Sequence, residues 1–194
     1  MPEALTAESI MQAAEEVLRR YGPAKTTVVD VARALDVSHG SVYRHFPSKA
    51  ALRDAVTQRW LDRISAPLEE IVAETGDPAG RLRTWVRQLA ASKQSIARED
   101  PELFATFRKV TAESGEVIDA HVEHLAAQLA RIVQDGVADG VLASVDPQVS
   151  GRAVLQATAM FHHPAHADEW ADPALHDQLE AVLDLLLEGL LPRG

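Results

Sequence analysis

The stretch of the sequence richest in potential chemistry runs from Asp36 to Lys49 and reads DVSHGSVYRHFPSK. It combines serine hydroxyls, two histidines, a tyrosine, an arginine and a lysine around a central glycine, Gly40. Such side chains donate hydrogen bonds to phosphate oxygens and to the edges of bases. A glycine among them lets the backbone approach another surface closely. The stretch is therefore a candidate nucleic-acid binding segment.

Two short helices and a long one are expected to position these groups. A capping box over Thr27 to Asp30 opens the first short helix, which ends near Leu35. The second begins near Ser38 and ends near His45, and Pro47-Ser48-Lys49 starts a helix that reaches the low seventies. Two short helices joined by a tight turn are typical of a helix-turn-helix, whose second helix enters the major groove of DNA.

The expected roles of the side chains follow from their positions on the second short helix. Ser38 caps it, and Val42 and Phe46 face inward onto the first helix. The candidate DNA contacts are Thr27, Ser38, His39, Gly40, Ser41, Tyr43, Arg44, His45 and Lys49.

The run TTVVDVARALDVSHGSVYRHFPSKAAL resembles the DNA-binding domain of the TetR family of transcriptional regulators. Family members share the pattern T-T-x-x-x-I-A-x-x-x-G-V-S-x-G-x-x-Y-x-H-F-x-x-K-x-x-L, and the resemblance covers about residues 7–60. It implies phosphate contacts from Thr27, Tyr43 and Lys49, and base-edge contacts from His39, Ser41, Arg44 and His45. Asp36 stands where the family usually has glycine, and aspartate accepts left-handed backbone geometry better than most residues. Val29 stands where a polar residue is common.

The composition agrees with a binding surface confined to one end of the chain. The 194 residues carry a net charge of −10, but residues 1–63 hold nine Lys and Arg against eight Asp and Glu, so the acidity lies beyond them. A near-neutral first part can present a local basic face. Cysteine is absent, which excludes disulfides and thiolate metal sites. No secretory signal or membrane span is recognisable, and we expect a cytoplasmic protein.

Helical spacing continues through nearly the whole sequence, so we expect an all-α fold of about nine helices. A DNA-binding domain, residues 1–48, is expected to be linked by a helix at about 49–73 to a ligand-binding and dimerisation domain, residues 49–194. Besides those described above, the expected helices are 7–21, 79–98, 101–111, 115–139, 147–161 and 173–190.

The last two helices are expected to form a homodimer. In LHDQLEAVLDLLLEGLL the leucines cover more than one stripe, too wide for packing on one side only. In the resemblance these helices pair with those of a second subunit as a four-helix bundle. The residues expected at this interface are Gly151, Ala157, Leu179, Leu183, Leu186 and Leu190.

The middle helices of TetR-like proteins enclose a ligand pocket, which the resemblance implies here for a small organic molecule. The candidate lining residues are Trp85, Leu89, Phe104, Phe107, His121, Met160, Phe161 and His162. Aromatic residues at helical spacing are also typical of a plain core, and no ligand class follows from them.

The passage MFHHPAHADEW offers a metal site as an alternative, since imidazole is the commonest protein metal ligand. Against it, Pro164 breaks the helix, so His162 and His166 cannot share one helical face. We therefore expect no metal and no cofactor.

The sequence thus predicts a TetR-like regulator, not an enzyme, that binds double-stranded operator DNA as a homodimer and is released from it by a small organic ligand. Two alternatives remain open. One is a metal-responsive regulator using His162, His163 and His166, and the other is a constitutive regulator whose C-terminal domain only dimerises. A metal-dependent hydrolase would need a carboxylate base and an oxyanion-stabilising group beside the metal, and no such motif is visible.

Overall fold

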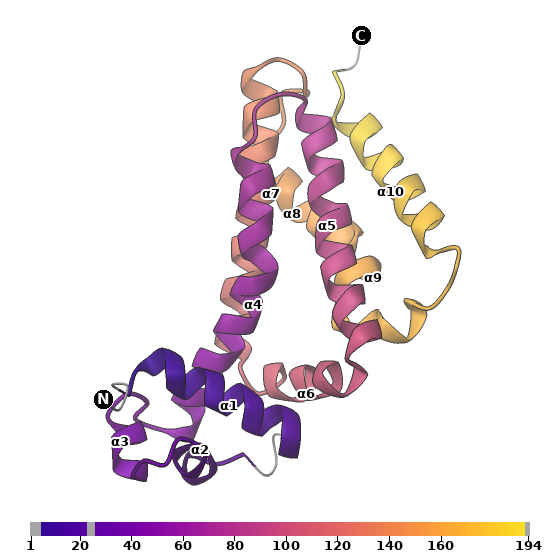
Figure 1. The fold of residues 1–194 in the computed structure, drawn as a ribbon. Helices are drawn as coiled ribbons and strands as arrows, with labels where there is room; N and C mark the ends of the chain where they lie inside the picture. Colours follow the sequence, from indigo (N-terminus) through magenta and orange to yellow (C-terminus); the bar gives the residue numbers. More distant parts are fainter. Residues whose placement is uncertain (1–4, 23–25, 193–194) are drawn as a thin grey trace. The chain divides into compact units, whose positions relative to one another are not determined.

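A computed structural model describes residues 5–22 and 26–192, and within these ranges the chain is helical without a strand. This part of the chain holds eleven helices (Figure 1), two more than the nine or so expected. In chain order they are α1 Ala7–Tyr21, α2 Val28–Ala34, α3 His39–Tyr43, α4 Lys49–Ala73, α5 Pro78–Glu99, α6 Pro101–Thr111, α7 Gly115–Ala138, α8 Pro147–Ala157, α9 Ala159–His162, the 3-10 helix η2 Pro164–Glu169 and α10 Leu175–Leu190. None of the described helices is both long and apolar enough to cross a membrane.

Side-chain caps set several of the helix boundaries. The hydroxyl of Thr27 accepts a hydrogen bond from the Asp30 amide while the Asp30 carboxylate accepts from the Thr27 amide, which is the expected capping box. Asp100 and Asp146 cap α6 and α8, each followed by proline at the first helical position. Gly22 caps α1 at a φ of 73°. Pro23, which follows Gly22, lies outside the described residues.

The helix expected over residues 147–161 is divided into α8 and α9 at Thr158. The Thr158 hydroxyl donates a hydrogen bond of 2.8 Å to the Val154 carbonyl, and its backbone has φ −98° and ψ 7°. A threonine that bonds back one turn in this way bends a helix. Similarly, α10 begins at Leu175 and not at Pro173, because the Asp172 carboxylate accepts from the Ala174 amide in a turn before the helix.

The chain forms two compact units, each with its own core. Unit 1 comprises residues 1–62 and 100–118, and unit 2 comprises residues 63–99 and 119–194. Both α4 and α7 continue from one unit into the other. The boundary predicted at residue 48 divides a DNA-binding from a ligand-binding function. It does not coincide with the limit of a compact unit, and it stays a prediction.

Unit 1 packs α1, α2 and α3 around the first half of α4, and α6 joins the same core. Its most deeply buried apolar side chains are Ile10, Val31, Val42 and Val56, each 0% exposed. Trp60 of α4 and Phe107 of α6 meet with ring centroids 5.6 Å apart. The apolar positions of five helices thus close one core under the helix-turn-helix.

Unit 2 buries the apolar faces of α5, α7 and α10 in one core, which also includes α8 and α9. Arg81 is buried there and donates to the Ile71 carbonyl, which satisfies an orphan acceptor at the end of α4. Arg83 and Arg87 of α5 both pair with Glu180 of α10. These guanidinium groups lower the pKa of the Glu180 carboxyl to about 2.

Candidate nucleic-acid interface

The turn between α2 and α3 depends on one left-handed residue, Asp36, with φ 54°. It is the one non-glycine residue with positive φ among those that the structure describes. The Asp36 amide donates to the Arg33 carbonyl and the Val37 amide to the Ala32 carbonyl, which closes the end of α2. Asp36 therefore supplies the backbone geometry for which the family pattern has glycine, and it allows the chain to turn directly into α3.

Inward-facing side chains hold α3 on unit 1, as expected. Val42 is 0% exposed and Phe46 is 8% exposed, and both belong to the core formed with Val31 of α2. The opposite face of α3 is therefore free of core packing.

The free face of α3 carries the polar groups expected to meet DNA. The side chains of His39, Tyr43, Arg44 and His45 are all exposed. The rings of His39 and Tyr43 stand edge to face with centroids 6.4 Å apart. His39 and Tyr43 lie about one turn apart on this five-residue helix, and Arg44 and His45 follow it directly, so a single surface in a groove can reach several of them.

Serine hydroxyls fix the start of α3. The Ser38 hydroxyl accepts from the Ser41 amide at 3.1 Å, as predicted for a cap. The two hydroxyls lie 2.9 Å apart, and the Arg44 guanidinium donates to the Ser41 hydroxyl at 3.2 Å. Ser41 thus holds Arg44 along the helix in this structure, and a base contact from Arg44 requires its guanidinium to exchange that partner for a base edge.

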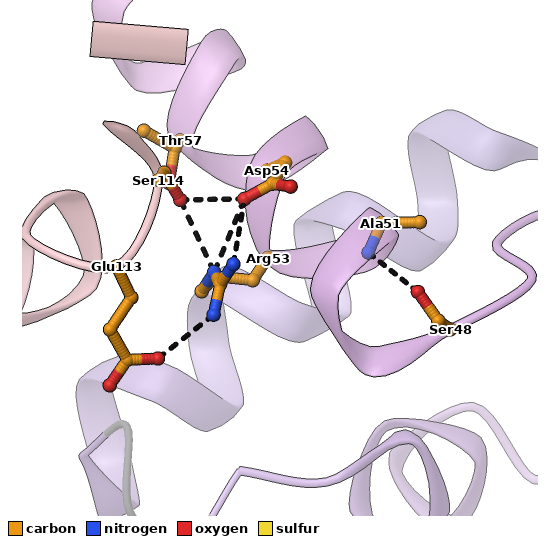
Figure 2. A network of polar contacts seen from close by, with 7 residues as sticks. All are labelled: Ser48, Ala51, Arg53, Asp54, Thr57, Glu113 and Ser114. Atoms are coloured by element: carbon orange, nitrogen blue, oxygen red, sulfur yellow. Dashed lines mark hydrogen bonds and ion pairs between the residues drawn. The ribbon is translucent and has the colours of Figure 1, made fainter. Parts of the chain in front are cut away.

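Lys49 is exposed at the first residue of α4. The hydroxyl of the preceding residue, Ser48, accepts a hydrogen bond of 3.0 Å from the Ala51 amide (Figure 2). The N-terminus of this 25-residue helix is electropositive, and an ammonium group beside it adds a full charge. Phosphate is favoured at such a place.

Thr27 is also exposed, but its hydroxyl is already engaged within α2. It donates to the Asp30 carboxylate at 2.6 Å, and this bond is the main cause of the lowered pKa of Asp30. A hydroxyl has one proton to donate. The phosphate contact of Thr27 therefore stays a prediction, and it requires that proton to leave Asp30.

A polar network that sequence reasoning did not anticipate joins the first turns of α4 to the corner between α6 and α7 (Figure 2). The Ser114 hydroxyl donates to the Asp54 carboxylate at 2.6 Å, and Arg53 donates to Glu113 at 2.9 Å. The Arg53 guanidinium also reaches the Ser114 hydroxyl at 3.2 Å. All four residues belong to unit 1. The network fixes the α4 segment that carries Lys49.

The expected ligand-pocket residues divide between the two units. Trp85, Leu89 and Phe161 lie in the core of unit 2, where the Trp85 indole donates to the Gln128 side chain at 2.9 Å. Phe104 and Phe107 belong to unit 1. Met160 is partly buried against the unit 2 core. Whether these residues contact a ligand stays a prediction.

His121 of α7 and His162 of α9 are buried in unit 2, at 6% and 7% exposure. Burial, with the positive charge of Lys93 as the next cause, lowers the pKa of His121 to about 3 and of His162 to about 4. Lys93 is itself 6% exposed and was not among the expected site residues. A lysine on a helix gives no sequence signal of burial.

The histidines of the MFHHPAHADEW passage make local contacts, and the rings of His163 and His166 meet with centroids 6.3 Å apart. His162 meets the Thr158 hydroxyl at 3.3 Å, whereas the His163 ring accepts from the Ala165 amide at 3.2 Å. His166 lies 3.6 Å from Glu169. Among the described residues no three histidine, aspartate or glutamate side chains come together as metal ligands.

The residues of the predicted dimer interface differ in how much surface they expose within one chain, and the interface itself stays a prediction. Leu179, Leu183 and Leu190 are buried in the core of their own chain. Gly151 is also buried, and a Cβ placed on it would lie 2.6 Å from the Ala130 amide nitrogen, so the close approach is to α7 of the same chain. Apolar residues that keep exposed surface on α8 and α10 include Val149, Ala153, Ala157, Val182, Leu185 and Leu186.

Comparison with family models identifies both parts of the chain. A model described as "Bacterial regulatory proteins, tetR family" matches residues 10–56, which include α2, α3 and the start of α4. A model described as "Tetracyclin repressor-like, C-terminal domain" matches residues 78–183, more than half of the chain.

Two relatives show the range of similarity. An uncharacterized HTH-type transcriptional regulator of Mycobacterium tuberculosis (strain ATCC 25618 / H37Rv) is 29% identical over 123 residues, 63% of this chain and 59% of the relative. The chain thus matches about three fifths of that relative's length. The HTH-type transcriptional regulator RutR of Escherichia coli (strain K12) is 25% identical over 200 residues, 96% of this chain and 91% of the relative.

A solved structure shares the fold over nearly the full length. A TetR transcription regulator from Haloarcula marismortui ATCC 43049 aligns with a TM-score of 0.72 and 21% identity, covering 96% of this chain and 98% of that chain. With the two family models, the relatives and the helix-turn-helix geometry in agreement, the chain belongs to the TetR family of transcriptional regulators.

Proposed function

We propose that this regulator is a homodimeric repressor that binds double-stranded operator DNA through α3 and is released by a small organic ligand. The observation that carries the DNA-binding part is the two-sided construction of α3. Val42 and Phe46 anchor one side in the core, and the other side exposes His39, Tyr43 and Arg44. A recognition helix needs both sides, one for rigidity and one for contact with the groove.

The contacts divide into positioning and reading groups. Tyr43 and Lys49 bind phosphates, which fixes the register of the protein on the duplex. His39 and Arg44 face base edges, and arginine bonds guanine with two hydrogen bonds. Because one head reaches only one half-site, two copies are required for high affinity.

Ligand response follows from thermodynamic linkage. A ligand that binds better to the conformation unsuited to DNA lowers the affinity for the operator, typically by a coupling of about 1–3 kcal/mol. The continuity of α4 supports this proposal, because the helix that begins with Lys49 extends into the core of unit 2.

Selection from a randomised DNA pool tests the proposal without knowledge of the operator. Purified wild-type protein is expected to enrich an inverted repeat whose half-sites lie about one helical turn, or a multiple of it, apart. Adding a small-molecule extract of the source cells to the complex is expected to release the DNA. Enrichment of no sequence would contradict the DNA-binding proposal, and a complex that no extract dissociates would favour a constitutive regulator.

A further inference from the structure

Three basic side chains lie buried together in the core of unit 2. Lys93 of α5, His121 of α7 and His162 of α9 are each 6–7% exposed. They are close enough for the charge of Lys93 to lower the pKa of both histidines. A hydrogen bond of 2.8 Å from the Gln94 side chain to the Phe161 carbonyl joins α5 to α9 next to them.

One nitrogen atom of this cluster lacks a hydrogen-bond partner among the described residues. His121 Nε2 is buried and makes no hydrogen bond within the described part of the chain. A buried polar atom without a partner costs roughly 1–3 kcal/mol. Native proteins keep few such atoms, and each calls for an explanation, such as a ligand or an ion that binds there.

The electrostatic surroundings favour one sign of ligand charge. The charges that act on His121 are those of Lys93 and His124, and those that act on His162 are those of Lys93 and His163. All of these groups are positive when charged. Burial lowers the pKa of Lys93 to about 8, so its ammonium form still predominates at neutral pH. An anion is attracted to this place, whereas a metal cation or an ammonium ligand is repelled.

The neighbouring side chains indicate what the anion is attached to. Leu89 lies one turn before Lys93 on α5, Leu125 lies one turn after His121 on α7, and Phe161 precedes His162. All three belong to the buried core of unit 2. A ligand whose charged end meets Lys93 would place its remaining atoms against apolar walls, as is usual for small-molecule sites.

We propose that Lys93 and His121, flanked by His162, bind the carboxylate of an organic acid with an apolar body, and that this acid is the ligand class of the regulator. The inference rests on the proposed ligand response and names its chemistry. The ammonium of Lys93 donates one hydrogen bond to the carboxylate, and Nε2–H of His121 donates a second.

The test uses octanoate, benzoate and phenylacetate, each compared with its uncharged amide at pH 7 and constant ionic strength. At least one carboxylate is expected to raise the melting temperature of the wild-type protein by a few degrees, and its amide is not. Lys93→Met is expected to weaken carboxylate binding roughly ten- to hundredfold, the usual loss for a hydrogen bond to a charged group. Arg83→Met, on the same helix but paired with Glu180, is the matched control and keeps the shift.

A second measurement on the wild-type protein does not depend on whether Lys93→Met folds. Because the pKa of Lys93 is about 8, the group is half protonated at pH 8, and anion binding is expected to take up about half a proton there. Calorimetry in HEPES and in Tris, which differ in ionisation enthalpy, measures this uptake.

Any of four results overturns the inference: no shift with all three carboxylates, an equal shift with the amides, a shift retained by Lys93→Met, or no proton uptake at pH 8. These measurements contain no DNA. If the protein fails them but still enriches an operator, the proposed DNA-binding function stands and only the ligand class is overturned.

Discussion

The Ser114 hydroxyl donates a hydrogen bond of 2.6 Å to the carboxylate of Asp54, two residues that are sixty apart in the sequence. It ties the corner between α6 and α7 to the second turn of α4 (Figure 2). Ser114 is 3% exposed, so water competes little for the bond. The same carboxylate holds Arg53, whose guanidinium also binds Glu113. One small side chain thus organises the helix that presents Lys49.

Replacement of this serine tests the energetic weight of the network. Ser114→Ala removes the donor to Asp54 and is expected to lower the free energy of unfolding by about 1.5–3 kcal/mol, the range for a hydrogen bond to a charged group. Urea denaturation followed by circular dichroism measures the change. Ser95→Ala is the control, because Ser95 donates to Glu99 on an exposed surface and its loss is expected to change little. Equal effects of the two substitutions would show that the network contributes no more to the free energy of unfolding than an exposed hydrogen bond does.

Two glycines provide a matched pair for the packing of unit 2. A Cβ on Gly151 would lie 2.6 Å from the Ala130 nitrogen and 2.9 Å from the Ala126 carbonyl oxygen, both backbone atoms. Gly151→Ala is therefore expected to destabilise the protein by about 1–3 kcal/mol or more. Gly189 lies in α10 with nothing within 4 Å of its Cβ position, so Gly189→Ala is expected to stabilise by up to about 1 kcal/mol. Thermal unfolding of both variants gives the sign, and a stabilising Gly151→Ala would contradict the α7–α8 packing.

The buried histidines predict a loss of stability in mild acid. In the folded chain the pKa values of His121 and His162 are lowered from 6.5 to about 3 and about 4. The unfolded chain therefore binds more protons between pH 6.5 and pH 4, and the free energy of unfolding falls as pH falls through this window. At pH 5 the loss is about 2 kcal/mol for each histidine, at roughly 1.4 kcal/mol per pH unit.

Urea midpoints at pH 7.5 and pH 5 measure this dependence. Replacing His162 by Gln is expected to make the two midpoints more alike than in the wild type. His176→Gln, at an exposed position at the start of α10, is the control and keeps the wild-type difference. A midpoint that is independent of pH in the wild type would mean that these imidazoles are not buried in their neutral form.

The dimer surface is tested by neighbouring leucines of α10. Leu185 is 72% exposed and Leu183 is 1% exposed. Leu185→Glu is expected to yield a folded monomer with weakened operator binding, because a charge is placed in the proposed interface. Leu183→Glu is expected to unfold unit 2, because it places a charge in the core. Sedimentation velocity and circular dichroism separate the two outcomes. A dimeric Leu185→Glu variant would move the interface away from this face of α10.

The DNA-binding face was largely predictable because its determinants are local. The cap at Ser38, the inward positions of Val42 and Phe46 and the turn at Asp36 are each set within a few residues. Boundaries shifted where one side chain intervened, as Thr158 did between α8 and α9. The periodic spacing of apolar residues in the sequence does not reveal a hydroxyl that bends a helix.

What the sequence could not predict depends on contacts between distant residues. Arg53 and Ser114 are sixty-one positions apart, and neither carries a local signal of the other. The burial of Lys93 is equally invisible, since lysine on a helix is usually solvated. Small residues such as Gly151 predict a close helix neighbour without telling whether it belongs to the same chain or to a partner.

The most direct test of the central claim, that α3 reads DNA, compares Arg44→Ala with Lys49→Ala on the DNA selected by the wild-type protein. Arg44→Ala is expected to relax the base preference at one position of each half-site, at about 1–3 kcal/mol per contact. Lys49→Ala is expected to weaken specific and non-specific binding together and to reduce the salt dependence by about one charge per subunit. Arg98→Ala, a 76% exposed arginine at the end of α5, is the control and binds as the wild type does. Unchanged affinity and base preference in both Arg44→Ala and Lys49→Ala would place the DNA-binding surface elsewhere on the molecule.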